Sequence, residues 1–264
     1  MTGRYRSRMP SETREGTESE RPVARLTWGR QSGLSDMWIS AAEAALLGGF
    51  LCLDRIVLQV MLSRPVITAP LIGLALGDPL TGLMAGAITE LLWIDRFPMG
   101  TYLPPNDTIA AVLIAAGAIM AGKHTGGASP ELLAASVLLF VPAAYIARQL
   151  DMLIARSNDA AATAAVDDAR GGDARAIAVR HYAALAKTFI LSSVFIFVLL
   201  LPGTMLLVYV FPMLPDCCMR TLVMVYWFIP VLGVAIALAT IKVRGKLPVF
   251  AGLLLVAMIV FGLW

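Results

Sequence analysis

Four polar side chains in an otherwise apolar part of the chain are candidates for holding a ligand by hydrogen bonds: Gln59, Glu90, Asn106 and Asp107. A charged group within an apolar segment is costly, so it usually faces a cavity or a partner group. Carboxylate and amide oxygens accept hydrogen bonds from hydroxyl groups, and amide N–H groups donate them. We therefore expect Glu90, Asn106 and Asp107 to line one polar cavity that suits a neutral polyol, with Gln59 as a weaker candidate.

Each of the stronger candidates also has a plainer structural explanation. Glu90 can lie near the membrane surface, because charged residues follow it within a few positions. Asn106 or Asp107 can cap the helix expected to start at Thr108, since short polar side chains accept hydrogen bonds from the first turn of a helix. Capping and ligand binding do not exclude each other, so both interpretations stay open at this point.

The sequence offers no clear groups for catalysis or metal binding. Its histidines are His124 and His181, and its cysteines are Cys52, Cys217 and Cys218. Their spacing fits neither a zinc site nor a disulfide framework. The sequence also lacks a GxxxxGK[ST] phosphate-binding loop and the HExxH and GxSxG motifs. We expect no catalytic residues on this chain, no metal and no cofactor.

Composition places the chain in a membrane. Of its 264 residues, 58% are hydrophobic and 15% are charged, against roughly half and about a quarter in soluble domains. Several uncharged stretches have the length needed to cross a bilayer. The net charge of +3 comes from basic residues in the tail and loops, where membrane proteins keep positive charge, so nucleic-acid binding is not indicated. The sequence predicts an all-α, polytopic transmembrane helical bundle.

The apolar segments differ in length, and this difference predicts the architecture. The segments are 37–62, 65–77, 79–94, 108–121, 132–150, 188–211, 222–241 and 247–264. At about 1.5 Å per residue, the second to fourth fall short of the roughly 30 Å hydrocarbon core. We expect short re-entrant helices in the first half, packed inside protein or along a water-filled cavity.

Two glycine pairs, Gly73 with Gly77 and Gly82 with Gly86, flank the break at Asp78. Each pair puts two small residues on one face of a helix, so that another backbone can approach closely. The pattern predicts two short helices packed tightly as a hairpin.

Polar segments divide the rest of the chain. Residues 1–36 are rich in arginine and glutamate, cannot bury a core and are predicted to be disordered, whereas 37–264 form the membrane domain. Residues 155–187 are rich in alanine and aspartate, which predicts a helical pair or hairpin at the surface. This segment and the basic cluster at 242–246 are separated by two spans, so both are expected on the cytoplasmic side.

The block from Leu53 to Thr108 resembles the IIC subunits of mannose-, sorbose- and N-acetylgalactosamine-type phosphotransferase systems. The matching pieces are Arg64-Pro65, Gly73, Gly77-Asp78, Thr81-Gly82, Gly86, Glu90-Leu91, Gly100 and the Pro-Pro-Asn-Asp stretch at 104–107. The polar segment is similar too, from Ala160-Ala161 through Gly172-Asp173 to Ile177 and His181. The family pattern commonly has aspartate directly after the proline that matches Pro105. Here Asn106 takes that place and Asp107 follows.

The resemblance implies a sugar-translocating subunit in the bacterial inner membrane, working as an oligomer with a separate IID-like membrane subunit. Soluble IIA and IIB proteins would relay phosphate to the entering hexose or amino sugar. Glu90, Asn106, Asp107 and Gln59 are then the candidate substrate-binding residues. The alternative is an ion-coupled secondary transporter for small solutes that uses Glu90 and Asp54 as ion sites, and this alternative predicts uptake by the chain alone.

Overall fold

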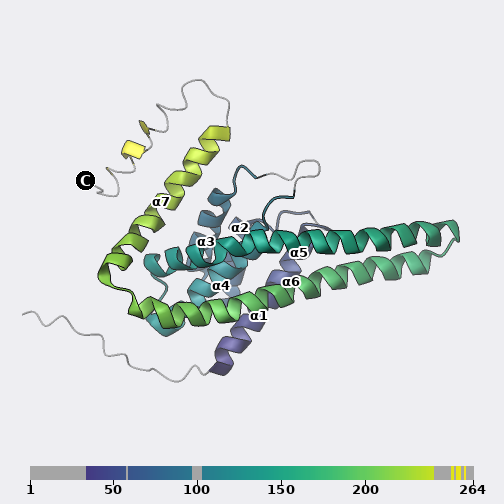
Figure 1. Cartoon of the computed structure of the whole chain (residues 1–264), viewed down its shortest axis with the longest axis horizontal. Coiled ribbons are helices and arrows are strands. Elements are labelled where there is room, and N and C mark those ends of the chain that lie inside the picture. Colours follow the sequence, from purple (N-terminus) through teal and green to yellow (C-terminus); the bar gives the residue numbers. More distant parts are fainter. Residues whose placement is uncertain are drawn as a thin grey trace, which may run out of the picture. The chain divides into compact units, whose positions relative to one another are not determined.

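Every regular element in the described part of the chain is helical, as the sequence predicts. The computed structural model describes residues 34–57, 59–96, 103–240, 251–252, 254–256 and 259. The helices follow in the order α1 (Leu34–Asp54), α2 (Pro65–Leu76), α3 (Pro79–Leu92), α4 (Asp107–Thr125), α5 (Pro130–Arg170), α6 (Ala174–Val210) and α7 (Asp216–Thr240), with one 3-10 turn, η1 (Phe211–Met213), before α7 (Figure 1). Proline is the first residue of α2, α3 and α5, where its fixed φ suits a helix and its missing N–H costs nothing.

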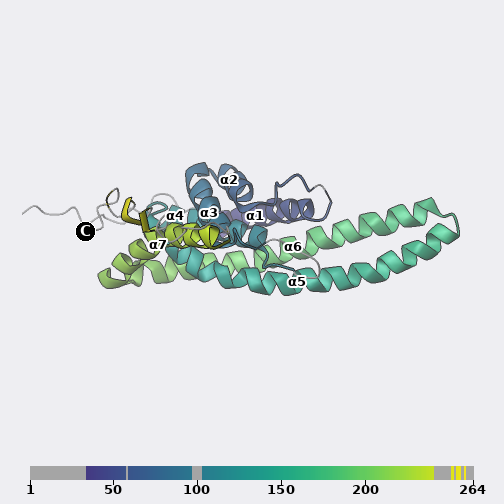
Figure 2. The ribbon, with the colours of Figure 1, turned by 90° about the horizontal axis from the view of Figure 1, so that it is seen from above.

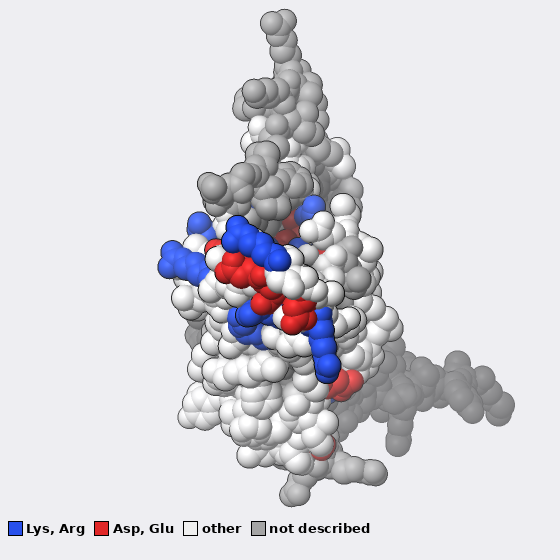
Figure 3. Space-filling view, turned by 90° about the vertical axis from the view of Figure 1, so that its right-hand side faces the viewer, with Lys and Arg blue, Asp and Glu red and all other residues white. Residues whose placement is uncertain are grey.

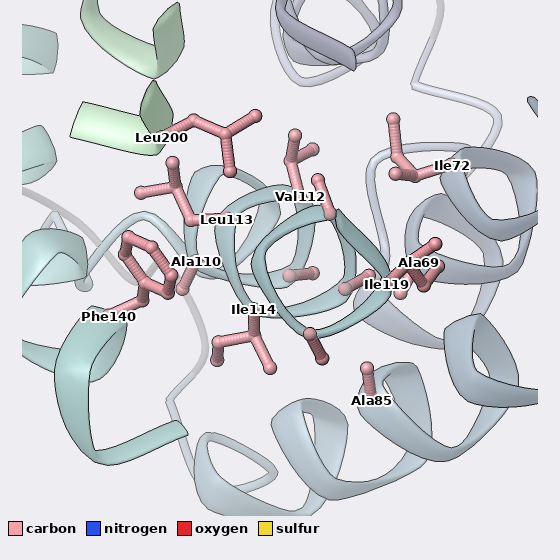
Figure 4. Packing of buried hydrophobic residues seen from close by; sticks show 14 of the residues in the cluster. Ala69, Ile72, Ala85, Ala110, Val112, Leu113, Ile114, Ile119, Phe140 and Leu200 are labelled. Carbon is pink, nitrogen blue, oxygen red and sulfur yellow. The ribbon is translucent and has the colours of Figure 1, made fainter. Parts of the chain in front are cut away.

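Helix α4 is the core of the membrane domain. Every residue from Thr108 to Gly122 is buried, and the helix packs against α1, α2, α3, α5 and α6. Figure 4 looks along α4 and shows Ile72 of α2, Ala85 of α3, Phe140 of α5 and Leu200 of α6 around it. Because α4 consists largely of alanine and other small residues, five neighbouring helices can approach it closely.

Glycines hold α2 and α3 together as a tight hairpin, as predicted. A Cβ added to either Gly73 or Gly82 would lie 3.0 Å from the Cα of the other, and one added to Gly86 would lie 2.5 Å from the carbonyl oxygen of Pro65. The prediction was wrong for Gly77, whose absent side chain faces open space. Gly77 ends α2 with a φ of 87°, a left-handed conformation that glycine adopts without strain.

The two longest helices, α5 and α6, run side by side as one hairpin that turns at Gly171 and Gly172 (Figures 1 and 2). Its polar end corresponds to the segment 155–187, which forms a helical hairpin as the sequence predicts. Arg180 of α6 pairs there with Asp168 of α5. Figure 3 shows the right-hand side of Figure 1, where basic and acidic side chains gather together on the hairpin end. Charged side chains are costly in lipid, so this end of the hairpin favours water.

Five of these helices are long and apolar enough to cross a membrane: α1, α4, α5, α6 and α7. Helices α2 and α3 have 12 and 14 residues, which supports the expectation of short helices in the first half. One of the three segments expected to be short is not, because α4 extends over 19 residues.

The structure moves several other boundaries. Helix α1 stops at Asp54, so segment 37–62 is not one helix. At its other end, Leu34 to Asp36 belong to α1 rather than to the tail that was predicted for 1–36. The predicted disorder of residues 1–33 and the basic cluster at 242–246 lie outside the described residues, as does most of segment 247–264.

Candidate functional site

The site begins where α1 ends. Asp54 is only 2% exposed, and its carboxylate accepts hydrogen bonds from the backbone N–H groups of Val60 at 2.9 Å and Ser63 at 3.0 Å. These bonds fold the following loop back over the helix end. Gln59 and Met61 have φ values of 50° and 67°, a left-handed conformation that costs side-chain-bearing residues about 1–3 kcal/mol. Strain of this kind persists only where surrounding contacts fix the backbone.

Asn106, rather than Asp107, caps the start of α4. Its Oδ1 accepts a hydrogen bond from the N–H of Ile109 at 3.0 Å, while its Nδ2 donates to both carboxylate oxygens of Asp151 at 3.2 and 2.9 Å. Its backbone N–H donates to the carbonyl of Ala144 at 3.0 Å. Asn106 is 1% exposed, and its hydrogen bonds to Asp151 and Ala144 tie the start of α4 to α5.

Asp107 forms an ion pair with Arg55. The Nη1 of Arg55 lies 3.3 Å from the Oδ1 of Asp107, and both side chains are about a fifth exposed. Next to it, the hydroxyl of Thr108 donates to the carbonyl of Ser63 at 2.7 Å. The loop after α1 and the first turn of α4 are therefore joined by one ion pair and one hydrogen bond.

Glu90 forms a second ion pair, with Arg64. The Nη1 of Arg64 lies 3.2 Å from the Oε1 of Glu90, and the backbone N–H of Val66 donates to the other carboxylate oxygen at 3.4 Å. Arg64 directly precedes α2, and Glu90 lies in the last turn of α3. The pair therefore joins the two ends of the α2–α3 hairpin.

Two cavities open among these groups. The loop cavity has a volume of about 350 Å³, and its polar lining includes Asp54, Arg55, Gln59, Arg64, Arg96 and Asp107. The hairpin cavity, at the base of the α5–α6 hairpin, has a volume of about 340 Å³ and a lining that includes Arg55, Asn106, Asp151, Asn158, Thr188 and Ser192. Arg55 lines both cavities, so the two cavities are neighbours.

The structure brings only part of the predicted set into one cavity. Gln59 and Asp107 line the loop cavity, whereas Asn106 lines the hairpin cavity. Glu90 is outside both linings, although its ion-pair partner Arg64 lines the loop cavity. The predicted residues thus lie on two neighbouring cavities, which share Arg55 in their linings, rather than on the single cavity that we expected. That these residues bind substrate stays a prediction.

Sequence reasoning missed Arg55 and Asp151 as parts of the site. Arg55 looked like a mere interruption of an apolar segment, and Asp151 stands directly after the segment 132–150, where a charge is ordinary. The available signal was the spacing of Asp151 and Asn158, which are seven residues apart on a helix and so share a face.

A larger cavity of about 590 Å³ lies among α3, α5 and α7, but its lining is almost wholly apolar, with Thr221 as the exception. It has too few hydrogen-bonding groups to recognise a hydroxylated solute. Within the part of the chain that the structure describes, no three histidine, cysteine, aspartate or glutamate side chains are grouped so that they could hold a metal ion.

Comparisons with known proteins agree on one family. The family model described as "PTS system sorbose-specific iic component" matches residues 38–263. The chain is 38% identical over 89 residues to "Putative N-acetylgalactosamine permease IIC component 2" of Escherichia coli (strain K12), an alignment covering 33% of this chain and 67% of the relative. It is 41% identical over 54 residues to "N-acetylgalactosamine permease IIC component 1" of the same organism, covering 20% of each.

Solved structures share the fold. One, described as "Structure of membrane protein", has a TM-score of 0.65 at 21% identity and covers 85% of this chain and 92% of its own. Another contains the mannose transporter ManYZ in complex with microcin E492, with a TM-score of 0.51 at 22% identity over 85% of this chain and 91% of the other. At such identities the likeness concerns the fold alone.

Proposed function

The chain belongs to the family of sorbose-specific IIC components of the sugar phosphotransferase system, and from this premise we propose that it binds a hexose or amino sugar and passes it inward for phosphorylation by soluble subunits. The sugar binds in the loop cavity, where Gln59 and Asp107 contact it directly. Glu90, beside this cavity, also accepts a hydrogen bond from a sugar hydroxyl, and Asn106 contacts the sugar from the hairpin cavity. The chain is a multi-pass membrane protein, and we assign it to the bacterial cytoplasmic membrane because its named relatives are from a bacterium.

The observation that carries this proposal is the charged loop cavity at the ends of the central helices. Two ion pairs and a buried carboxylate surround it, although the domain around it is built from apolar helices. Its volume of about 350 Å³ lies in the usual range of roughly 300–1,000 Å³ for small-molecule sites. Carboxylates, amides and guanidinium groups together both accept and donate hydrogen bonds, as recognition of a polyol requires.

Exposed apolar side chains on the short helices α2 and α3 support a partner subunit that covers them. Leu74 of α2 and Leu80 of α3 are 62% and 61% exposed, yet their helices are too short to cross the hydrocarbon core. Such segments are stable at membrane depth only when protein packs against them. This supports a IID-like membrane subunit, or a further copy of this chain in an oligomer, as the neighbour. Soluble IIA and IIB proteins then supply the phosphate.

The geometry disfavours the ion-coupled alternative. The carboxylate of Asp54 is occupied by two backbone N–H groups, and Glu90 is neutralised by Arg64. Each carboxylate therefore already has a partner within the chain and is not an open site for a proton or a cation.

Reconstitution tests the proposal. The chain is placed in lipid vesicles with and without its membrane partner, together with soluble relay proteins and a radiolabelled phosphate donor. We expect labelled sugar phosphate inside only when both membrane subunits are present, and no label on this chain. A stable phosphorylated form of this chain, or unmodified sugar accumulating through it alone, would contradict the proposal.

A further inference from the structure

The hairpin cavity presents one ordered helix face to its interior. Its α5 wall consists of Asp151, Ile154, Ala155 and Asn158, a spacing of i, i+3, i+4 and i+7 that places all four side chains on the same side of a helix. Polar groups stand at the two ends of this face and apolar groups lie between them. A ligand in the cavity would therefore meet two polar contacts about two helical turns apart.

The first polar group, Asp151, has acceptor capacity to spare. Both of its carboxylate oxygens accept from the same donor, the Nδ2 of Asn106, at 3.2 and 2.9 Å. An ionised carboxylate offers about four lone-pair positions, so one amide group does not exhaust it. Because Asp151 lines the cavity, it can accept further hydrogen bonds from hydroxyl or N–H groups of a ligand there.

The second polar group, Asn158, has an unused acceptor. Its Oδ1 is buried and has no hydrogen-bond partner among the described residues. A buried polar atom without a partner costs about 1–3 kcal/mol, and a ligand donor would remove this cost. Across the cavity, Arg55 brings a donor, and Ile56 and Leu103 bring apolar surface.

We propose that the hairpin cavity is a second part of the sugar site and that Asp151 is its specificity-determining residue. Asp151 and Asn158 accept hydrogen bonds from two hydroxyl groups of the sugar, or from a hydroxyl and the N–H of an amino sugar. Ile154 with Ile56 packs against the C–H face of the ring. The inference rests on the proposed function, because it names additional contacts for the same substrate.

A merely positioning role for Asp151 makes a different prediction. If Asp151 acts only by holding Asn106 at the start of α4, its loss weakens every sugar by the same factor. If Asp151 touches the sugar, its loss matters only for sugars that carry the contacting hydroxyl. Deoxy analogues separate the two roles.

The test uses the full chain in complex with its membrane partner in lipid nanodiscs. Calorimetry first identifies the tightest ligand among N-acetyl-D-galactosamine, D-galactosamine, D-mannose and L-sorbose. Its monodeoxy analogues are then measured with the parent protein, with Asp151→Asn and with Asn158→Ala. Asp159→Asn is the matched control, because Asp159 is exposed and lies beside, not on, the cavity face.

We expect Asp151→Asn to weaken the best sugar at least tenfold and to leave one deoxy analogue bound as by the parent. Asn158→Ala should repeat this pattern at a different ring position, and it avoids any disturbance of the Asn106 cap. Asp159→Asn should bind all ligands like the parent. Equal losses for every analogue, or parent-like binding by both cavity variants, would overturn the inference while leaving the proposed function intact. A parent complex that binds none of the four sugars would overturn the proposed function itself.

Discussion

Replacing Glu90 by glutamine separates a substrate contact from a structural ion pair. The substitution keeps the size of the side chain and removes the charge that pairs with Arg64 at 3.2 Å. We expect sugar affinity to fall at least tenfold, since a hydrogen bond from a sugar hydroxyl to a charged carboxylate is stronger than one to a neutral amide.

The two roles of Glu90 differ in size. The side chains of Arg64 and Glu90 are 33% and 24% exposed, and an ion pair so accessible to water contributes about 0.2–1 kcal/mol. Its loss would change affinity less than about tenfold even if all of it were felt at the site. A hydrogen bond between a charged group and a sugar hydroxyl is worth about 1.5–3 kcal/mol, which corresponds to roughly 10- to 150-fold in affinity.

Binding is measured on the purified complex by isothermal titration calorimetry, and thermal melting checks that each variant is folded. Glu131→Gln serves as the control, because Glu131 is also partly buried but lines neither cavity. The charge-swapped protein, Arg64→Glu with Glu90→Arg, restores an ion pair without restoring the carboxylate at position 90. Parent-like affinity in Glu90→Gln, or recovery of affinity in the swapped protein, would show that Glu90 acts only as the partner of Arg64.

Three further outcomes are expected. A single cysteine introduced at Arg175, on the exposed α5–α6 hairpin, should not react with a membrane-impermeant maleimide applied to intact cells, but should react after permeabilisation. Ready labelling from outside would contradict the predicted cytoplasmic location of the hairpin. Deletion of residues 2–33, which leaves α1 whole, should barely change membrane insertion and uptake because the segment is too polar to build a core, and an inactive truncation would reveal a functional arm. Gly82→Ala should lower the melting temperature, since its Cβ would lie 2.5 Å from the carbonyl oxygen of Ala69 and overpacking costs about 1–3 kcal/mol. Gly252→Ala is the control, because its Cβ would meet no atom within 4 Å. Equal melting temperatures for the two variants would refute the close contact at Gly82.

Apolar patterning predicted the helices well but marked the ends of apolar segments rather than the ends of helices. The sequence becomes polar near Ala155, yet α5 continues to Arg170 because the alanines of the polar stretch favour helix as well. At α1 the apolar segment, which Asp54 and Arg55 interrupt, continues to Leu62, but the helix ends at Asp54. There the carboxylate of Asp54 binds the backbone of the following loop, a contact that no periodicity records.

The candidate site was predictable where a polar residue stands within an apolar segment or directly after a proline turn. Gln59 was found for the first reason and Asp107 for the second, and both line one cavity. Asp151 was missed because its partner Asn106 is 45 residues away, and such a contact depends on how α4 packs on α5. The presence of Arg55 in the linings of both cavities likewise depends on tertiary structure.

The burial of α4 has a consequence for biogenesis. Its most apolar window has a mean hydropathy of 1.4, against 2.6 for α6, and 83% of that window is covered by other helices. Ribosomes make α1, α2 and α3 before α4, whereas α5 and α6 follow it. Three of the five helices that enclose α4 are therefore present when it enters the bilayer, and lipid must cover its remaining faces until the last two are synthesised. Small apolar side chains tolerate this interval, because lipid tails are as apolar as the helices that later replace them.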